Sequence, residues 1–512
     1  MDPKLSTETL LRRAPRSLPP DLEEQRQRIL AIAKRHGLDT FETVFEMCDY
    51  DEINMIAAYG GFPVRYPHWR WGMEYMQMAK GYEYGLQKIY ELVINTSPSY
   101  AYLLDNNAFV DQKLVMAHVF GHVDFFKNNC WFQHTDRKML DKMANHARRV
   151  RLIADRIGES TTEAWLDVCL SVDNLIDPYL THIRRDREMD PLDADVLTPN
   201  SFRLPARHHM ESYINPPDLL ERQHKEAAAE AAKAQKFPES PVRDVLGFVL
   251  KHGRLERWQA DILAIVRDEA YYFAPQGQTK IMNEGWASYW HTKLMTEEIL
   301  TDSEVIDYAD HHSGTVVMRP GQINPYKIGL ELFRDIEQRW NKGQFGKDWL
   351  DCDDAAVRRD WYKPTNEGKS KIFEVRKTHN DVTFLDTFLT EDFCKRAGLF
   401  TYEFDKKSGE YLVDSREFAA VKQKLLFMVG GRGSPRVQVT DGNHANRGEL
   451  ELTHDYEGVD IQLEWAQQAL GNLAKLWGRP VHLRTQIEEK PALLHHDGTT
   501  FTYDGPKIKG KA

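Results

Sequence analysis

Two segments of this 512-residue sequence carry the residues of a candidate metal site. They are Met116-Ala-His-Val-Phe-Gly-His122 and Met282-Asn-Glu-Gly-Trp-Ala-Ser-Tyr-Trp-His291. His118 and His122 are four residues apart, so on a helix their imidazoles lie on one face, about 6 Å apart along the axis. Glu284, near the start of the second segment, can supply a third ligand. Two histidines from one helix and a carboxylate from a later one are the ligands of many zinc hydrolases. The spacing therefore predicts a metal site.

One part of the hydrolase pattern is missing. In such enzymes a glutamate directly follows the first histidine and deprotonates the water that the metal activates, whereas this chain has Val119. The pattern thus indicates a metal site more strongly than a hydrolase. The candidates for a replacement base are Asp124, Glu163, Asp167 and Glu269. Asp124 falls about 200° round the helix from the preceding histidine, so we expect it to point away.

A structural alternative places both histidines in an apolar core, since Leu114, Val115, Phe125 and Phe126 lie on the same helix. Glu284 weighs against that alternative, because a buried glutamate is rare without a partner. His291 lies on the helical face of Glu284 but about 10 Å further along. It therefore fits a contact to a ligand residue or to substrate better than a fourth ligand. In a hydrolytic site, His291 or Tyr289 would steady the developing oxyanion.

Composition predicts a globular protein of two to four domains, since 41% of residues are hydrophobic and 11% are aromatic. A net charge of −11 gives no general attraction to nucleic acid or to an anionic membrane. The five cysteines show no Cys-x-x-Cys spacing, which is typical of a reducing compartment. No signal peptide and no apolar run of about 18 residues is found, so we expect a soluble, cytoplasmic protein without a membrane span.

The order of periodic segments predicts the α+β class with two domains. Residues 1–395 are mainly helical, beginning with a helix over 21–35, and are interrupted at 186–243 by a polar arm or insertion. Beyond residue 396 the pattern alternates. Strands are expected near 399–404, 411–413, 436–439, 449–454, 481–487 and 499–503, with helices at 415–427 and 462–477. This order is close to β-α-β-β-α-β, so residues 396–512 are predicted as a ferredoxin-like sandwich used for docking or regulation.

Two further blocks attract attention. The loop around Tyr66, His68, Trp69 and Trp71 is rich in aromatic side chains, a pattern more typical of a packed corner than of a ligand-binding wall. Asp310-His-His-Ser-Gly314 lies further along the chain, without a role that the sequence assigns.

Several blocks, in this order, resemble the stage V sporulation protein R (SpoVR) family over nearly the full chain. They are the two segments quoted first together with Tyr66-Pro-His-Trp69, Tyr82-Glu-Tyr-Gly85, Val93-Ile-Asn-Thr96, Phe125-Phe-Lys-Asn-Asn129 and Asn324-Pro-Tyr326. The resemblance implies a bacterial cytoplasmic protein with a role in sporulation and the peptidoglycan of the spore cortex, or in stationary-phase stress. It also implies a PrkA-type serine kinase and a von Willebrand factor A-like protein as partners.

The sequence leaves three hypotheses for the chemistry. The first is a regulatory or scaffold protein that keeps a metal site of zincin-like arrangement, and the missing base favours it. The second is a zinc-dependent, gluzincin-like hydrolase that acts on an amide or peptide bond, with Glu284, His291 and Tyr289 as catalytic residues. The third is a redox metal, because two histidines and one carboxylate also suit non-haem iron.

Overall fold

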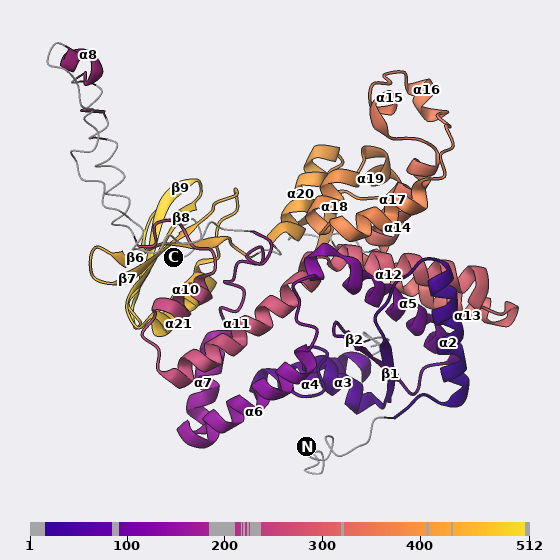
Figure 1. Cartoon of the computed structure of the whole chain (residues 1–512), viewed down its shortest axis with the longest axis horizontal. Helices are drawn as coiled ribbons and strands as arrows, with labels where there is room; N and C mark the ends of the chain where they lie inside the picture. The colour runs from indigo at the N-terminus through magenta and orange to yellow at the C-terminus, as the bar shows by residue number, and fades with distance from the viewer. Residues whose placement is uncertain are drawn as a thin grey trace. The chain divides into compact units, whose positions relative to one another are not determined.

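The structure is a computed structural model that describes residues 16–83, 92–183, 210–216, 237–318, 322–405, 409–431 and 434–506, together with 218, 221, 222 and 225. Two compact units are present (Figure 1). The first comprises Met1–Glu163 and Tyr271–Gly433, and the second comprises Ala164–Ala270 and Ser434–Ala512. Two of the boundaries between the units fall within the sequences of α7 (Glu159–Leu170) and α11 (Arg257–Gln278).

The first unit is mainly helical. Its helices are α2 (Pro20–Arg35), α3 (Tyr50–Ala58), α4 (Trp69–Glu83), α5 (Phe109–Asn128), α6 (Met139–Ile157), α12 (Lys280–Leu294), α13 (Val305–Thr315), α14 (Pro325–Asn341), α15 (Gly346–Leu350), α16 (Ala355–Arg359), α17 (Gly368–Thr378), α18 (Asp381–Phe388), α19 (Glu391–Ala397) and α20 (Phe418–Gly431). A small sheet has the order β1 (Thr43–Cys48), β3 (Ser99–Leu104), β2 (Leu92–Ile94), and a separate hairpin pairs β4 (Thr401–Asp405) with β5 (Glu410–Ser415).

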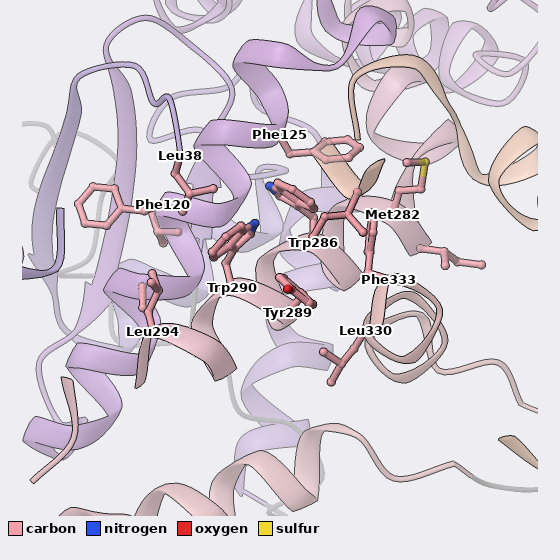
Figure 2. Close-up of a cluster of buried hydrophobic side chains, with 14 of the residues drawn as sticks. Leu38, Phe120, Phe125, Met282, Trp286, Tyr289, Trp290, Leu294, Leu330 and Phe333 are labelled. Atoms are coloured by element: carbon pink, nitrogen blue, oxygen red, sulfur yellow. The ribbon is translucent and has the colours of Figure 1, made fainter. Parts of the chain in front are cut away.

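Helices α5 and α12 form the centre of this unit, because both are buried on nearly every side. Figure 2 shows the apolar cluster around them, in which the ring of Trp286 lies 5.2 Å from that of Phe333 on α14. Small residues let the backbones meet. A Cβ on Gly121 would lie 2.7 Å from Cα of Ala287, and one on Gly285 would lie 2.4 Å from Cα of Gly329. Gly121 therefore allows α5 to cross α12 closely, and Gly285 allows α12 to cross α14 closely.

The second unit is built on a five-stranded sheet. Its order is β10 (Phe501–Asp504), β9 (Lys490–His496), β8 (Val481–Ile487), β7 (Glu449–His454), β6 (Val437–His444). Only β7 and β8 are parallel, and α21 (Leu463–Trp477) connects them as a crossover helix. Leu470, Leu473 and Trp477 on α21 are buried. The unit also contains α10 (Val245–His252) and α8 (Glu211–Ile214).

The predicted class is confirmed at the level of a mostly helical N-terminal region and a C-terminal sheet domain, but the ferredoxin-like arrangement is wrong. The first two predicted strands form the separate hairpin β4–β5, and the following helix α20 buries Val421 and Leu425 in the core of the first unit. Strand β9 was missed. It follows β8 through a two-residue turn, Glu488-Glu489, whose positive φ values of 48° and 62° are usually supplied by asparagine or glycine.

The predicted boundary at residue 395 does not coincide with the division into units, which falls after Gly433 and also assigns Ala164–Ala270 to the second unit. The cause is the packing of α20 on α18, which ties residues 418–431 to the helical unit. The first predicted helix is confirmed as Pro20–Arg35. Most of the predicted arm at 186–243, and Gly85 of one SpoVR-like block, lie outside the described residues.

Among the helices that the structure describes, none combines the length and the apolar character needed to cross a bilayer.

Candidate metal centre

The structure brings together the three predicted ligands. His118 and His122 lie one turn apart on α5, and Glu284 lies on the first turns of α12, next to the Gly121–Ala287 crossing. Oε2 of Glu284 is 3.6 Å from Nε2 of His118 and 3.4 Å from Nε2 of His122. Residues more than 150 positions apart in the chain thus meet because two helices cross at glycine.

The geometry fits a bound cation. A tetrahedral zinc ion with bonds of about 2.0–2.2 Å holds its ligand atoms about 3.4 Å apart. The ligand atoms of His118, His122 and Glu284 all lie within 4.8 Å of one another, and all three side chains are buried. Oε2 of Glu284 makes no hydrogen bond within the described part of the chain. A buried carboxylate oxygen without a hydrogen bond destabilises the folded protein unless a cation lies close to it.

Glu284 is ionised in this setting. Burial would raise its pKa, but the neighbouring imidazoles of His122 and His118, together with the ammonium group of Lys280, hold the pKa well below the ordinary value. Lys280 lies one turn before Glu284 on α12, and its Nζ donates to Oε1 at 2.6 Å. One carboxylate oxygen is thereby engaged, and the other faces the two histidines. The arrangement suits ligation through a single oxygen.

His291 lies beside the ligands, as predicted, and Tyr289 does not. Nδ1 of His291 is 2.7 Å from Nδ1 of His118, which leaves Nε2 of His118 directed at Glu284. A hydrogen bond of this kind orients a metal-binding imidazole. The hydroxyl of Tyr289 instead donates to Glu337 at 2.7 Å, and burial together with that carboxylate raises its pKa. The geometry does not support the predicted oxyanion role of Tyr289.

A cavity of about 610 Å³ opens onto the three ligands. Polar side chains that the sequence did not assign to the site also line it: Asp111 on α5, Lys280 on α12, His311 and His312 on α13, and Tyr326 on α14. The ring of Tyr326 lies 6.2 Å from that of His118, so this tyrosine, rather than Tyr289, faces the centre. His311 and His312 belong to the Asp310–Gly314 block, to which the sequence alone assigned no role.

None of the four predicted replacement bases lines this cavity. Asp124 points away, as predicted: its carboxylate accepts from Nε1 of Trp286 at 2.8 Å and from Arg376 at 3.0 Å. Burial raises its pKa to about 6 although Arg376 opposes the shift. Glu163 accepts from the backbone N–H of Trp69. Asp167 and Glu269 belong to the second unit.

The aromatic loop is a packed corner, as predicted. Tyr66 and Trp71 are buried, and Nε1 of Trp71 donates to the carbonyl oxygen of Tyr66 at 3.0 Å. The guanidinium of Arg65 lies 3.8 Å from the Trp71 ring. Arg65, Tyr66, His68 and Trp71 are therefore buried together at this corner, whereas Trp69 is 53% exposed.

A family model described as "SpoVR like protein" matches residues 17–433, and a second, "SpoVR-like C-terminal domain", matches residues 435–488. The chain belongs to the SpoVR family. This SpoVR protein is similar to the "Uncharacterized protein YcgB" of Escherichia coli (strain K12), with 28% identity over 496 residues, 90% of each chain. No solved structure matches it. The two family models meet next to Gly433, where the described units also divide.

Proposed function

We propose that this SpoVR protein is a metal-dependent hydrolase whose ion is bound by His118, His122 and Glu284. The observation that carries the proposal is the cavity of about 610 Å³ beside the three ligands. A structural zinc site is closed by four protein ligands, whereas a catalytic site has three and leaves a position for water or substrate. The three proposed ligands face a cavity, and they therefore match a catalytic site.

Residues of the chain would bind the ion, orient its ligands and orient the substrate. A divalent ion held by His118, His122 and Glu284 would polarise a carbonyl oxygen and would make a water molecule more acidic. His291 fixes the ring of His118 through the contact between their Nδ1 atoms. Tyr326 also lines the cavity, and we propose that its hydroxyl steadies the oxygen of a substrate amide. We propose zinc as the ion, with iron as the alternative, and an amide or peptide bond, related to the cell wall, as the substrate.

Metal content tests the proposal directly. The parent protein, purified without added metal and analysed for its elements, should carry one ion per chain, and the identity of that ion separates zinc from iron. His118→Ala and Glu284→Gln should lose it. His134→Ala, which changes an exposed histidine of the same unit, should retain it. A parent that binds no ion after dialysis against zinc or iron, or a His118→Ala variant that still binds one, would contradict the proposal.

Hydrolysis is tested separately. The parent with its ion bound is incubated with peptides released from peptidoglycan, and the products are identified by mass spectrometry. We expect cleavage of an amide bond by the parent and none by Glu284→Gln. A metal-loaded parent that cleaves none of them would leave the second candidate function, a regulatory or scaffold protein with a structural ion. Val119, in place of the usual glutamate, favours that second candidate.

The family suggests the cellular setting. We propose a cytoplasmic protein that acts in sporulation and cortex formation, or in the stress response of the stationary phase, with a PrkA-type serine kinase and a von Willebrand factor A-like protein as partners. A pull-down that compares the full chain with a chain lacking residues 434–512 tests whether the C-terminal sheet unit captures these partners. Equal capture by both would contradict a docking role for that unit.

A further inference from the structure

The cavity contains a histidine that is held by a carboxylate from another helix. Nδ1 of His311 on α13 is hydrogen-bonded to Oδ1 of Asp111 on α5, although the two residues are 200 positions apart. Both side chains line the cavity next to the three ligands. The side chain of Asp111 is 11% exposed and that of His311 is 35% exposed. The pair is therefore partly shielded from water but reachable from the cavity.

The position of this pair relative to the metal centre is set by several contacts. Asp111 lies seven residues before His118, two turns along the same face of α5. On the other side, Nδ1 of His312 lies 3.4 Å from Nε2 of His291, which in turn contacts His118. His312, the residue next to His311 on α13, is thus separated from the proposed ligand His118 by the single imidazole of His291.

The start of α13 is also fixed to α5. Nζ of Lys113 donates to Glu304 at 2.6 Å, and the side chain of Lys113 is only 3% exposed. This partly buried ion pair holds the segment that leads into α13 against the helix that carries the two proposed ligand histidines. The segment before α13 is therefore held against α5, and the side chain of His311 is held by its hydrogen bond to Asp111.

An imidazole whose Nδ1–H donates to a carboxylate presents Nε2 as a proton acceptor, which is the arrangement of the histidine in serine hydrolases. We propose that His311 is the general base of this site and that Asp111 is its positioning residue. The pair would perform the task of the glutamate that follows the first histidine in many zinc hydrolases, where this chain has Val119. The inference rests on the proposed hydrolytic function.

The step balances in atoms and protons. Nε2 of His311 takes a proton from the attacking water as the water oxygen bonds to the amide carbon. The C–N bond then breaks, and the proton passes from His311 to the leaving nitrogen. Carboxyl and amine products result, and His311 returns to its neutral form.

Competing bases in the cavity are few. Among the described residues that line it, the carboxylates are Asp111 and Glu284, and Glu284 is a proposed ligand. The other titratable groups that face the cavity are His118, His122, Lys280, His291, His312 and Tyr326. His291 is committed to His118, and burial lowers the pKa of His312. His311 is hydrogen-bonded to Asp111, a carboxylate that is not a proposed ligand.

Cobalt(II) replaces the ion as a spectroscopic probe in the test. The full-length parent, His311→Gln, Asp111→Asn and Asp310→Asn are loaded with Co(II), and the visible spectrum of each is recorded as a function of pH. Asp310→Asn is the matched control, because it removes a carboxylate from an exposed position of α13. Circular dichroism checks that every variant is folded, and Asp111→Asn preserves the shape of the side chain that it replaces.

We expect all four proteins to bind one Co(II) ion. The pH midpoint of the spectral change should rise in His311→Gln by about one unit, a tenfold loss of acidity, because solvent in the cavity loses its proton acceptor. Asp111→Asn should shift the midpoint in the same direction by less, and Asp310→Asn should not shift it.

The outcomes separate the two proposals. Failure of the parent to bind Co(II) would overturn the metal centre and the general base together. Full Co(II) binding with an unchanged midpoint in His311→Gln would overturn the general base alone. Loss of Co(II) from His311→Gln would make His311 a ligand, which also excludes its role as base.

Discussion

Replacing Gly121 by alanine should separate α5 from α12 without changing any proposed ligand. The added Cβ would lie 2.7 Å from Cα of Ala287 and 3.2 Å from its Cβ. Non-bonded carbon atoms normally rest about 3.5–4.0 Å apart, so the helices must move apart by roughly 1 Å. Overpacking of a tight core typically costs about 1–3 kcal/mol. We expect Gly121→Ala to lower the free energy of unfolding of the metal-free protein by that amount, measured by urea denaturation.

The same displacement should weaken metal binding. Glu284 lies three residues before Ala287, so it moves with α12 away from the histidines, which are now 3.4 and 3.6 Å from its Oε2. Metal–ligand distances tolerate deviations of only about 0.2 Å. We expect the affinity for zinc to fall by about tenfold or more, equivalent to about 1.4 kcal/mol, in a competition titration against a chromophoric chelator.

Gly72→Ala is the matched control. Gly72 lies exposed within α4, and a Cβ there meets no atom within 4 Å. This substitution should raise stability by about 0.5–1 kcal/mol, because alanine loses less backbone entropy in a helix than glycine does. A Gly121→Ala protein as stable as Gly72→Ala, with the zinc affinity of the parent, would refute the argument that close helix packing sets the site.

Three other predictions follow from the structure. Asp124→Ala leaves the guanidinium of Arg376 buried without its carboxylate, so urea denaturation should show a loss of about 3–5 kcal/mol; a loss below about 1 kcal/mol would contradict the importance of this ion pair. Removing the bound ion with a chelator should lower the melting temperature, because metal at a hundredfold excess over its Kd contributes about 2.7 kcal/mol to the native state; equal melting curves would count against binding to the folded protein. Hydrogen bonding from Arg447, with a further contribution from His482, lowers the pKa of Glu449 from 4.5 to about 2. The stability that this carboxylate contributes is complete above pH 4.5 and is lost as the pH falls to about 2, so Glu449→Gln should flatten this part of the acid denaturation curve; parallel curves would contradict the assignment.

The sequence was sufficient to predict that the proposed ligands His118, His122 and Glu284 lie close together, because the rules used for each of them are local. Spacing of four places His118 and His122 on one helical face, and a buried glutamate needs a partner. Lys280 could have been found by the same reasoning, since it lies four residues before Glu284 and such pairs interact on a helix. The contact that joins the two helices was not predicted, because nothing local shows that Gly121 opposes Ala287.

Asp111 and His311 could not be paired from the sequence. Their contact requires α13 to pack on α5, and that packing depends on side chains from several segments. The prediction of a ferredoxin-like C-terminal domain was wrong for a related reason. The helices and all strands except β9 were predicted near their observed positions, but whether α20 covers the sheet or the helical core is decided by burial of Val421 and Leu425, which a periodic pattern cannot distinguish.

The crossing of α5 and α12 has a consequence for the order of events during folding. The histidines are synthesised more than 150 residues before Glu284, and neither helix can be buried until the other is present. The centre therefore cannot exist on a nascent or partly assembled chain, whose exposed imidazoles would hold an ion weakly. Retention of the proposed ion would therefore show that the whole helical unit has folded, so the metal content of a preparation would measure its fraction of intact protein.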